Sequence, residues 1–498
     1  MHGGRTETFK MLVTDPNIRM HYVDVNSLYP YVNARKRYPI GHPKIILNDF
    51  GDISQICNNY FGFIYCTVIT PDNNNEKLYA PVLPGKFSKE KKLIFALCQT
   101  CAEMKQTKLC EHSIEDRCIT GVWFSEELKL ALEMGYEIKR VFGVHHFERT
   151  STHLFSDYIK TFYKIKLLAS GKPENCETAE QLQTYIANIK QNDDVDLTNC
   201  TFENNPSLRT VAKLCLNSLW GKFGTRPILP KPEFCKNIQE LNNLFEDPAL
   251  EVADIIIMHS QMVVAICKQK NLQFVDINNN CNIYLAACTT AYARIELYKY
   301  LNIVKERAVY CDTDSLIYIS EPGNDIETGE YLGQMKNELD KDEYIIKFVS
   351  GGPKNYAFIT NKNKAVIKLK GFVQTITNTE AINFDNFEKI VEAFAIIPAN
   401  NEDDEEIDET DRVTLKSAKV LRDEKLLMRE RAAEVHNAKP SEHSAMAAEN
   451  FISVYNPVAI ARTKCWDLVQ KKEQKIFTVN YDKRIVTTDF NTFPYGYR

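Results

Sequence analysis

Residues 308–319, AVYCDTDSLIYI, place two carboxylates between two runs of apolar residues. Each run is rich in β-branched, aromatic and aliphatic residues and therefore predicts a short strand, with Asp312-Thr313-Asp314 as the turn. In an extended stretch residues i and i+2 share a side, so Asp312 and Asp314 are expected to point together. Two such anions repel unless a cation or a proton joins them. A solvated turn is the alternative, because Asp is a common turn former.

A third carboxylate, Asp24, stands at the end of the strand-like run 20–25. A polar turn, Asn26-Ser27, follows it and leads into an aromatic-rich segment that could start a helix. Alone, an Asp at a strand end is usually a cap or a turn residue. Asp24 is therefore interpreted together with Asp312 and Asp314, as one candidate cation site.

An amphipathic helix is predicted between the two acidic segments, over residues 206–224. Asn205 and Pro206 are helix start signals, and Gly221 and Gly224 are stop signals. Its apolar stripe consists of Leu208, Val211, Ala212, Cys215 and Leu219. Its polar and aromatic stripe consists of Arg209, Lys213, Asn217 and Trp220. Aligned cations suit a triphosphate and an aromatic can pack on a base, although an ordinary surface helix is the alternative.

These segments resemble the ordered motifs of the family B DNA polymerases. DVNSLYP at 24–30 resembles motif A, KLCLNSLWG at 213–221 resembles motif B, and YCDTDS at 310–315 resembles motif C. Lys354-Asn355-Tyr356 resembles the K-x-Y motif that holds the primer end, and Gly3-Gly4 resembles the glycine pair that precedes motif A. The resemblance is to the protein-primed branch, type B2, which is found in bacteriophages, linear plasmids and Polinton or Maverick transposons.

The resemblance implies an α+β right-hand polymerase fold: a palm whose antiparallel sheet carries the acidic site, helical fingers and a thumb, with insertions like the terminal-protein regions of that branch. The expected segments are palm 1–50 and 281–380, first insertion 51–150, fingers 151–225, second insertion 226–280 and thumb 381–498. Helices are expected over about 153–170 in the fingers, 289–300 in the palm and 414–437 in the thumb. The similarity begins at the polymerase domain, so the proofreading exonuclease is expected to be absent or encoded elsewhere.

The same resemblance implies template-directed addition of deoxynucleotides to a primer 3′ hydroxyl with two Mg²⁺ ions, for which carboxylate oxygens are suitable ligands. The expected metal ligands are Asp24, Asp314, the Val25 carbonyl and, more weakly, Asp312. The expected nucleotide site consists of Val25, Ser27, Leu28, Tyr29, Lys166, Lys213, Asn217 and Trp220. The expected primer site consists of Lys354, Tyr356, Gly3 and Gly4.

The assignments of Tyr29 and Lys166 have alternatives, and Trp220 departs from the family pattern. Tyr29 resembles the steric gate that excludes ribonucleotides, whereas a core-filling Tyr is the alternative. Lys166 best matches the lysine of the first fingers helix, and Lys160 and Lys164 read equally well as surface lysines. Trp220 stands where the family usually has Tyr, so nucleotide selection is expected to differ.

Fifteen cysteines, with no signal peptide and no long apolar span, indicate a reducing interior, not a disulfide framework. Cys98, Cys101, Cys110 and His112 form a C-x2-C-x8-C-x-H pattern that suits a small structural zinc site, with Cys118 as a substitute fourth ligand. Reduced cysteines in a core, beside apolar neighbours, are the alternative reading.

The net charge of −5 is unexpected for a protein that contacts phosphates. An acidic stretch at 401–409 contributes to it, so basic residues are expected to concentrate in a cleft. The expected partners are a DNA primer-template, deoxynucleoside triphosphates and a terminal protein, with no membrane. The expected location is intracellular, in the nucleus or at a viral replication site. A catalytically inactive remnant that binds DNA or a terminal protein is the alternative function.

Overall fold

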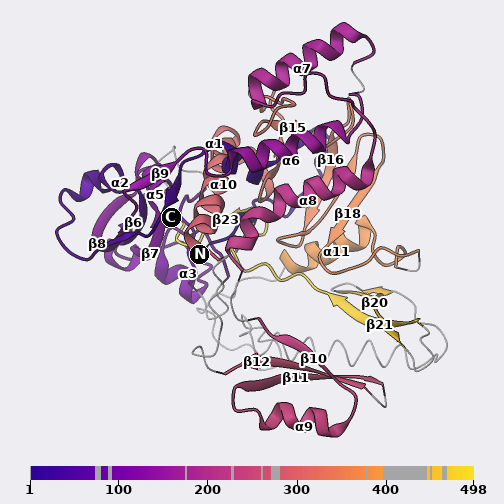
Figure 1. Cartoon of the computed structure of the whole chain (residues 1–498). Coiled ribbons are helices and arrows are strands. Elements are labelled where there is room, and N and C mark those ends of the chain that lie inside the picture. The colour runs from indigo at the N-terminus through magenta and orange to yellow at the C-terminus, as the bar shows by residue number, and fades with distance from the viewer. Residues whose placement is uncertain are drawn as a thin grey trace. The chain divides into compact units, whose positions relative to one another are not determined.

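The computed structural model describes residues 2–72, 80–87, 92–173, 176–225, 229–259, 262–270, 281–376, 378–395, 446–448, 451–462 and 468–498. The chain divides into two compact units (Figure 1). The first comprises residues 1–216, 287–455 and 474–498, and the second comprises residues 217–286 and 456–473. The acidic stretch 401–409 and the expected thumb helix 414–437 lie outside the described residues.

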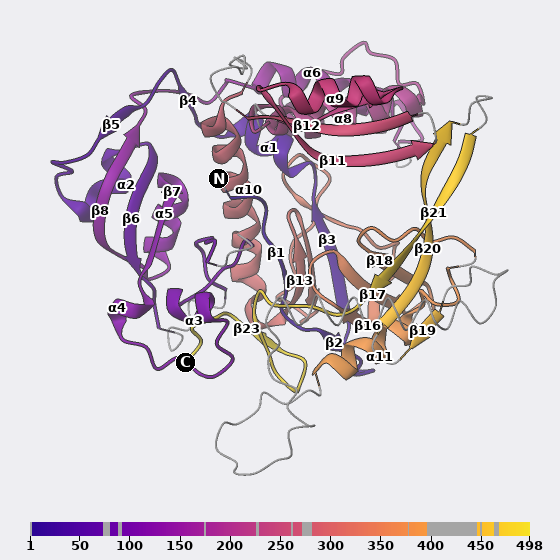
Figure 2. The same cartoon turned by 90° about the horizontal axis from the view of Figure 1, so that it is seen from below.

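A nine-stranded sheet organises the first unit, and all its strand pairs are antiparallel (Figure 2). Its main path runs β1-β13-β14-β3-β16-β17-β18, with β15 paired to β3 and β2 paired to β16. The strands are β1 (Thr6–Thr8), β2 (Leu12–Val13), β3 (Met20–Val25), β13 (Ala308–Asp312), β14 (Ser315–Ile319), β15 (Met335–Asn337), β16 (Ile345–Ser350), β17 (Asn355–Thr360) and β18 (Ala365–Leu369). The hairpin expected at 308–319 is thus β13 and β14, and the strand expected at 20–25 is β3.

The sheet's core forms where alternate strand residues turn inward. Met20, Tyr310, Ile317 and Phe348 pack in one buried cluster from four different strands. On another part of the sheet, α11 (Phe384–Ala395) contributes Phe387 to a second cluster. Burying these apolar side chains holds the strand ends, and any polar residues at those ends, in a fixed register.

Helices α6 (Ser156–Leu168) and α8 (Pro206–Phe223) form an antiparallel pair (Figure 1). Asn205 N donates to Ala169 O at one end, and the Tyr158 hydroxyl donates to Cys215 O at the other. The predicted cap is present, since Asn205 Oδ1 accepts from Leu208 N at 3.0 Å. Gly221 lies inside α8, because the helix continues to Phe223.

Between α6 and α8 the chain forms an additional helix, α7 (Ala179–Asp193), within the segment expected to form the fingers. Thr178 and Gln181 form a capping box at its start. At its end Asp193 accepts from the Tyr163 hydroxyl and from Leu332 N, both at 3.0 Å. These bonds tie α7 to α6 and to the loop before β15.

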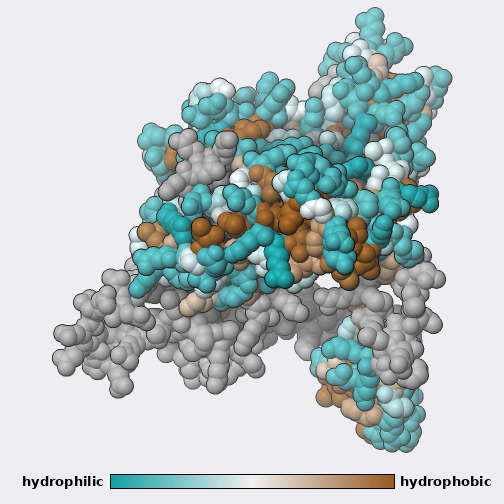
Figure 3. Space-filling model, turned by 90° about the vertical axis from the view of Figure 1, so that its left-hand side faces the viewer, coloured by the Kyte–Doolittle hydropathy of each residue, from teal (hydrophilic) through white to brown (hydrophobic). Residues whose placement is uncertain are grey.

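A second antiparallel sheet, in the order β5-β8-β6-β7, occupies much of residues 44–146. Its strands are β5 (Lys44–Ile46), β6 (Gly62–Ile69), β7 (Ile119–Phe124) and β8 (Glu137–His146). The nearby helices are α2 (Ile56–Asn59), α3 (Gln99–Met104), α4 (Ile114–Arg117) and α5 (Ser125–Glu133). Ile64 and Val68 of β6 are buried, whereas Tyr65 of the same strand is exposed. Hydrophobic surface among hydrophilic residues is visible on the side of the molecule that carries this sheet (Figure 3).

The second unit contains the sheet β10-β12-β11 and one helix. Its elements are β10 (Lys231–Cys235), α9 (Ile238–Glu246), β11 (Leu250–His259) and β12 (Met262–Gln269). Leu241 and Leu244 of α9 pack on Cys235 and Cys267 of the sheet. These four elements lie within residues 226–280, the predicted second insertion, whereas the unit also includes residues 217–225 of the predicted fingers and 456–473 of the predicted thumb.

The remaining elements are α1 (Leu28–Arg35), β4 (Tyr38–Ile40), β9 (Arg149–Ser151), α10 (Ile283–Val304), β19 (Met446–Ala448), β20 (Phe451–Arg462), β21 (Leu468–Phe477), β22 (Ile485–Val486) and β23 (Thr492–Phe493). The predicted palm helix, 289–300, corresponds to the longer α10. Among the described residues, none of the helices has both the length and the apolar character needed to cross a lipid bilayer.

A buried ion cluster joins the two ends of the described chain. Glu7 Oε2 accepts from Arg5 Nε at 2.7 Å, and Glu7 Oε1 lies 3.6 Å from Arg484 Nη1. All three side chains are at most 2% exposed. Burial alone would raise the pKa of Glu7, but Arg5 and Arg484 lower it overall, so the carboxylate stays charged.

We expect Glu7→Gln to lower the free energy of unfolding by about 3–5 kcal/mol, because it leaves two buried cations without their counter-charge. Urea unfolding at neutral pH measures this change. Asp340→Asn is the control, since its pair with Lys364 is 3.9 Å long and exposed and should contribute little. Equal stability of the two variants would contradict a structural role for the cluster.

Candidate active site

Asp24, Asp312 and Asp314 come together at one end of three adjacent strands. In the strand register Asp312 pairs with Ser315, and Ser315 pairs with Asp24. Val25 N donates to Asp314 O at 2.8 Å, which joins the end of β3 to the β13–β14 turn. Two segments far apart in sequence therefore place their carboxylates in one site.

The turn geometry differs from the sequence expectation. Asp314 is not in an extended stretch with Asp312: Thr313 and Asp314 are the central residues of a tight turn, and Asp314 N donates to Asp312 O at 2.7 Å. Thr313 has φ of 64°, in the left-handed region that β-branched residues rarely adopt. The argument from strand alternation was wrong, but the two carboxylates still interact, because Asp312 raises the pKa of Asp314.

Burial and the neighbouring carboxylates shift the pKa values of two of the acids. Burial and the Asp314 charge raise the pKa of Asp24 to about 8. Burial and the Asp312 charge raise the pKa of Asp314 to about 6. Both shifts mean that the fully ionised group is unfavourable without a cation.

Two further residues act on this site that the sequence did not single out. Glu338, just after β15, raises the pKa of both Asp24 and Asp314. Lys368 of β18 lowers the pKa of Asp24, and its Nζ lies 5.6 Å from the centre of the Tyr356 ring. Neither residue belongs to a recognisable motif, so only sheet topology could reveal them.

Asp312 is held by its neighbours. Its Oδ1 accepts from Thr6 Oγ1 at 3.0 Å, and its two oxygens accept from Lys354 Nζ at 2.8 and 2.9 Å. Lys354 N in turn donates to the Tyr310 hydroxyl at 2.8 Å. The lysine expected at the primer end thus lies directly beside the acidic site.

The glycine pair lies against the Asp-Thr-Asp turn. A Cβ on Gly4 would come within 2.9 Å of the Thr313 side chain, so the backbone approach requires glycine here. Thr313 N donates to Arg5 O, and Arg294 Nη1 donates to Gly3 O at 2.7 Å. Gly3 and Gly4 therefore support the turn that carries Asp314.

Ser27, Leu28 and Tyr29 lie where β3 passes into α1. Ser27 has φ of 55°, a left-handed conformation that turns the chain sharply after Asn26. Leu28 and Val25 are each 1% exposed and anchor this turn in the core. Burial, followed by the Asp314 charge, raises the pKa of Tyr29 to about 12.

A group of cations lies on the other side of Ser27. Lys166 Nζ donates to Ser27 Oγ at 3.0 Å. Burial, followed by the charges of Arg209, Lys213 and Lys336, lowers the pKa of Lys166 to about 8. Lys213 also lowers the pKa of Asp24. These cations repel one another, and an anionic ligand would relieve that repulsion.

The remaining predicted residues are Tyr356, Asn217 and Trp220. Tyr356 is 4% exposed, stacks among Tyr310, Phe348 and Phe358, and shares a 3.3 Å hydrogen bond between its hydroxyl and that of Tyr22. Asn217 and Trp220 continue along α8 beyond Lys213, in the second unit. Their contacts with nucleotide or primer stay predictions.

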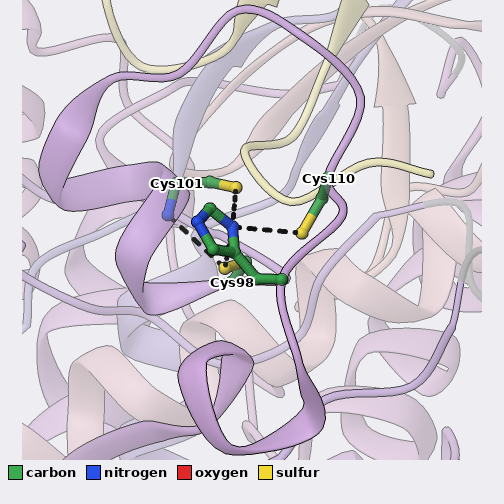
Figure 4. Close-up of side chains that lie close together, drawn as sticks. Cys98, Cys101 and Cys110 are labelled. Carbon is green, nitrogen blue, oxygen red and sulfur yellow. Dashed lines mark hydrogen bonds between the residues drawn. The ribbon is translucent and has the colours of Figure 1, made fainter.

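A second cluster lies apart from these carboxylates in the sequence. Cys98, Cys101 and Cys110 point toward one another (Figure 4), with His112 among them. Cys118, the substitute ligand, lies outside this group, and its Sγ is 3.1 Å from Ile114 O.

The model of the family "DNA polymerase type B, organellar and viral" matches residues 1–182 and 184–306. The chain belongs to this family. The match contains the segments of motifs A and B, and motif C follows directly after it.

Relatives in this family come from fungi. A probable DNA polymerase of Podospora anserina is 29% identical over an alignment of 421 residues, and the match covers 78% of this chain and 29% of that protein. A probable DNA polymerase of Neurospora intermedia is 26% identical over 378 residues, 74% of this chain and 32% of that protein. The chain thus spans about a third of the length of these type B polymerases.

Among solved structures, the phi29 DNA polymerase bound to primer-template DNA is similar over 78% of this chain and 56% of its own, with 19% identity and a TM-score of 0.47. The ternary complex of the same enzyme with incoming nucleotide covers the same shares, with 18% identity and a TM-score of 0.48.

Mg²⁺, which type B polymerases imply, fits the acidic site. Asp24 and Asp314 supply the hard carboxylate oxygens that this ion prefers. Their raised pKa values show an excess of negative charge that a divalent cation would neutralise. Asp312, already bonded to Lys354, would be the weaker ligand.

We expect the metal-free chain to lose stability as pH rises from about 4 to about 8. Carboxyl groups in an unfolded chain titrate near pH 4, whereas Asp24 and Asp314 have raised pKa values of about 8 and 6. The folded state therefore holds more protons in this window, and the free energy of unfolding falls with pH. Urea unfolding at several pH values measures this slope.

Added Mg²⁺ should stabilise the chain more at about pH 8 than at about pH 5, since protons compete for the same oxygens. Asp24→Asn should flatten the pH dependence of stability and reduce the stabilisation by Mg²⁺. Of the two carboxyl groups with raised pKa values, it removes the one with the larger shift. If the free energy of unfolding changed with pH in this variant as it does in the wild type, the raised pKa of Asp24 in the folded state would be contradicted.

Proposed function

We propose that this chain is a template-directed DNA polymerase that adds deoxynucleotides to a primer 3′ hydroxyl. The observation that carries the proposal is the convergence of Asp24, Asp312 and Asp314 beside the cations Lys166 and Lys213. A phosphoryl-transfer site needs both features: oxygens for metal ions, and positive charge for the triphosphate.

Asp24 and Asp314, with the Val25 carbonyl, would hold two Mg²⁺ ions, and Asp312 would contribute more weakly. The chemistry that these ions supply when bound is a lower pKa for the primer hydroxyl and charge neutralisation on the triphosphate. Thr6 and Lys354 fix the orientation of Asp312. The turn at Thr313 keeps Asp314 at the strand end, against the repulsion of its neighbours.

On the nucleotide side, Lys166 and Lys213 bind the phosphates and offset their charge. Arg209 and Lys336 belong to the same group of cations and extend it. The Lys166–Ser27 bond positions the lysine next to the turn that carries Leu28 and Tyr29. Tyr29 would lie under the sugar, while Asn217 and Trp220 would act farther along α8.

On the primer side, a basic groove supports the assignment. A cavity of about 380 Å³ is lined by Lys354, Lys368 and Lys370, with Leu369 and Phe372 among its apolar walls. Lysines suit a phosphate backbone as point charges without reading sequence. We propose that the primer end enters this groove beside Asp312, with Tyr356 as the buried support of Lys368.

We propose the polymerase subdivisions on the same grounds. The nine-stranded sheet, from segments 1–50 and 281–380, would be the palm, and α6, α7 and α8, within 151–225, the fingers. Segments 51–150 and 226–280 would be insertions like the terminal-protein regions, and 381–498 the thumb. Together they would form the right-hand arrangement.

The proposed partners are a DNA primer-template, deoxynucleoside triphosphates and a terminal protein whose hydroxyl starts synthesis. Replication of a mobile element or a virus is the corresponding role. No cysteine among the described residues is part of a disulfide, which fits a reducing intracellular compartment. Primer extension with and without a candidate terminal protein separates protein priming from priming by a nucleic-acid end.

We expect Asp314→Asn to lower Mg²⁺-dependent primer extension by at least about 100-fold, because it removes a charged metal ligand. DNA binding should persist, since the lysines of the groove are untouched. A gel extension assay and a fluorescence-anisotropy binding assay measure the two effects. Asp340→Asn, which changes an exposed acid outside the proposed ligand set, is the matched control.

Loss of DNA binding together with extension in Asp314→Asn would indicate misfolding, which a melting temperature checks. A wild-type chain that binds DNA or a terminal protein but never extends a primer would instead support an inactive binding remnant.

We expect Tyr29→Val to raise incorporation of ribonucleotides relative to deoxynucleotides by about 10-fold or more, because a smaller side chain leaves space for a 2′ hydroxyl. Competition between the two nucleotides on one template measures the ratio. Tyr29→Phe is the control, since it keeps the ring and removes only the hydroxyl. Unchanged selectivity in Tyr29→Val would remove the gate assignment.

A further inference from the structure

Three cysteines and one histidine form a compact group next to α3. Cys98 precedes the helix, Cys101 lies in its first turn, and Cys110 and His112 follow in the loop before α4. Their ligand atoms all lie within 4.8 Å of one another. The cysteines are at most 4% exposed, so their sulfurs are shielded from bulk water.

The distances match a tetrahedral metal site. His112 Nδ1 lies 3.7, 3.2 and 3.6 Å from the sulfurs of Cys98, Cys101 and Cys110. Zinc bonds of about 2.3 Å to sulfur and about 2.0 Å to nitrogen give ligand separations of about 3.5 Å on a tetrahedron. An imidazole nitrogen offers either one proton or one lone pair, so it cannot bond to three thiols at once.

The surroundings of the sulfurs include a buried cation and a backbone donor. Arg117 is 2% exposed, and its Nη1 lies 3.3 Å from the Cys110 sulfur. Cys101 N donates to the Cys98 sulfur at 3.4 Å. Three thiolates around one Zn²⁺ carry a net charge of −1, which the buried guanidinium balances. Such outer hydrogen bonds orient the ligands of a metal site.

The ligand loop also holds segment 481–498, which runs across it. Leu97 N donates to Tyr495 O at 2.7 Å, and Cys110 N donates to Tyr497 O at 2.8 Å. Arg117 Nη1 donates to Gly496 O at 3.0 Å. A Cβ on Gly496 would come within 2.5 Å of Cys98, so the two backbones are in direct contact.

The same segment reaches the strand beside Asp312. The Tyr481 hydroxyl and Thr492 Oγ1 both donate to Thr8 O, at 3.0 and 2.7 Å. Lys483 Nζ donates to Thr6 O at 3.2 Å, and Thr6 Oγ1 donates to Asp312 Oδ1 at 3.0 Å. Segment 481–498 thus contacts both the cysteine cluster and β1, whose Thr6 bonds to Asp312.

We propose that Cys98, Cys101, Cys110 and Nδ1 of His112 bind one structural Zn²⁺, and that this ion fastens segment 481–498 to the insertion and so braces β1. The inference is independent of polymerase activity. It assigns the ion no part in nucleotide chemistry, because four protein ligands close the coordination sphere.

The decisive measurement is the metal content of the purified full chain. We expect one zinc per chain by mass spectrometry of the metal, and tetrahedral thiolate absorption bands after exchange for Co²⁺. A folded chain that holds no zinc and gives no such bands with Co²⁺ overturns the proposal.

Variants separate the ligands from their neighbours. Cys98→Ser, Cys101→Ser and His112→Ala should each lose the zinc, while His112→Cys should keep it because a fourth thiolate replaces the imidazole. Cys118→Ser should bind zinc like the wild type. Zinc retained in His112→Ala, or lost in Cys118→Ser, overturns the ligand assignment. If a variant fails to fold, the wild-type stoichiometry and Co²⁺ spectrum still decide.

Hydrogen exchange tests the structural consequence. Removing zinc with a chelator should abolish protection at the Leu97 and Cys110 amides and speed exchange across segment 481–498, while β12 amides in the second unit stay unchanged. Unaltered exchange in segment 481–498 after zinc removal overturns the bracing role. Primer extension need not be measured for any of these outcomes.

Discussion

Mutual repulsion of Asp24, Asp312 and Asp314 is the constraint on which the acidic site depends. Burial favours protonation of Asp24 and Asp314, and their raised pKa values record that tendency. The sheet holds them together nonetheless, because moving one away would break strand pairs and expose apolar core. The protein thus uses the stability of its core to keep an unfavourable charge arrangement ready for a cation.

Backbone strain is concentrated at the same place. Ser27, Thr313 and Lys354 all have positive φ. Ser27 and Lys354 are themselves predicted site residues, and Thr313 directly precedes Asp314. Non-glycine residues in this region cost on the order of 1–3 kcal/mol and persist only where the surroundings enforce them. Here Gly4, Arg5 and Tyr310 enforce them through close contacts and backbone bonds. Sharp turns at three strand ends allow the acids and the residues proposed to bind nucleotide and primer to share one end of the sheet.

Much of this site could be predicted from the sequence, because its carboxylates and the hairpin at 308–319 depend on local pattern. The Asn205 cap and helix 206–223 were also predictable for that reason. Helix α7 was missed, although Thr178 and Gln181 carry a capping box that could have revealed it.

Glu338, Lys368 and the Arg5–Glu7–Arg484 cluster could not be predicted, since their neighbours come from remote strands. The turn at Thr313 was misread because strand alternation was extended into residues that leave the strand.

The order of strands has a consequence for biosynthesis. Strand β3, near residue 24, has its main partner β14 near residue 315, so it emerges from the ribosome long before that partner exists. Until then an apolar strand with open edges is exposed to solvent, which is the condition for aggregation. We expect the nascent chain to depend on chaperones during this interval, and the acidic site to appear only late in translation.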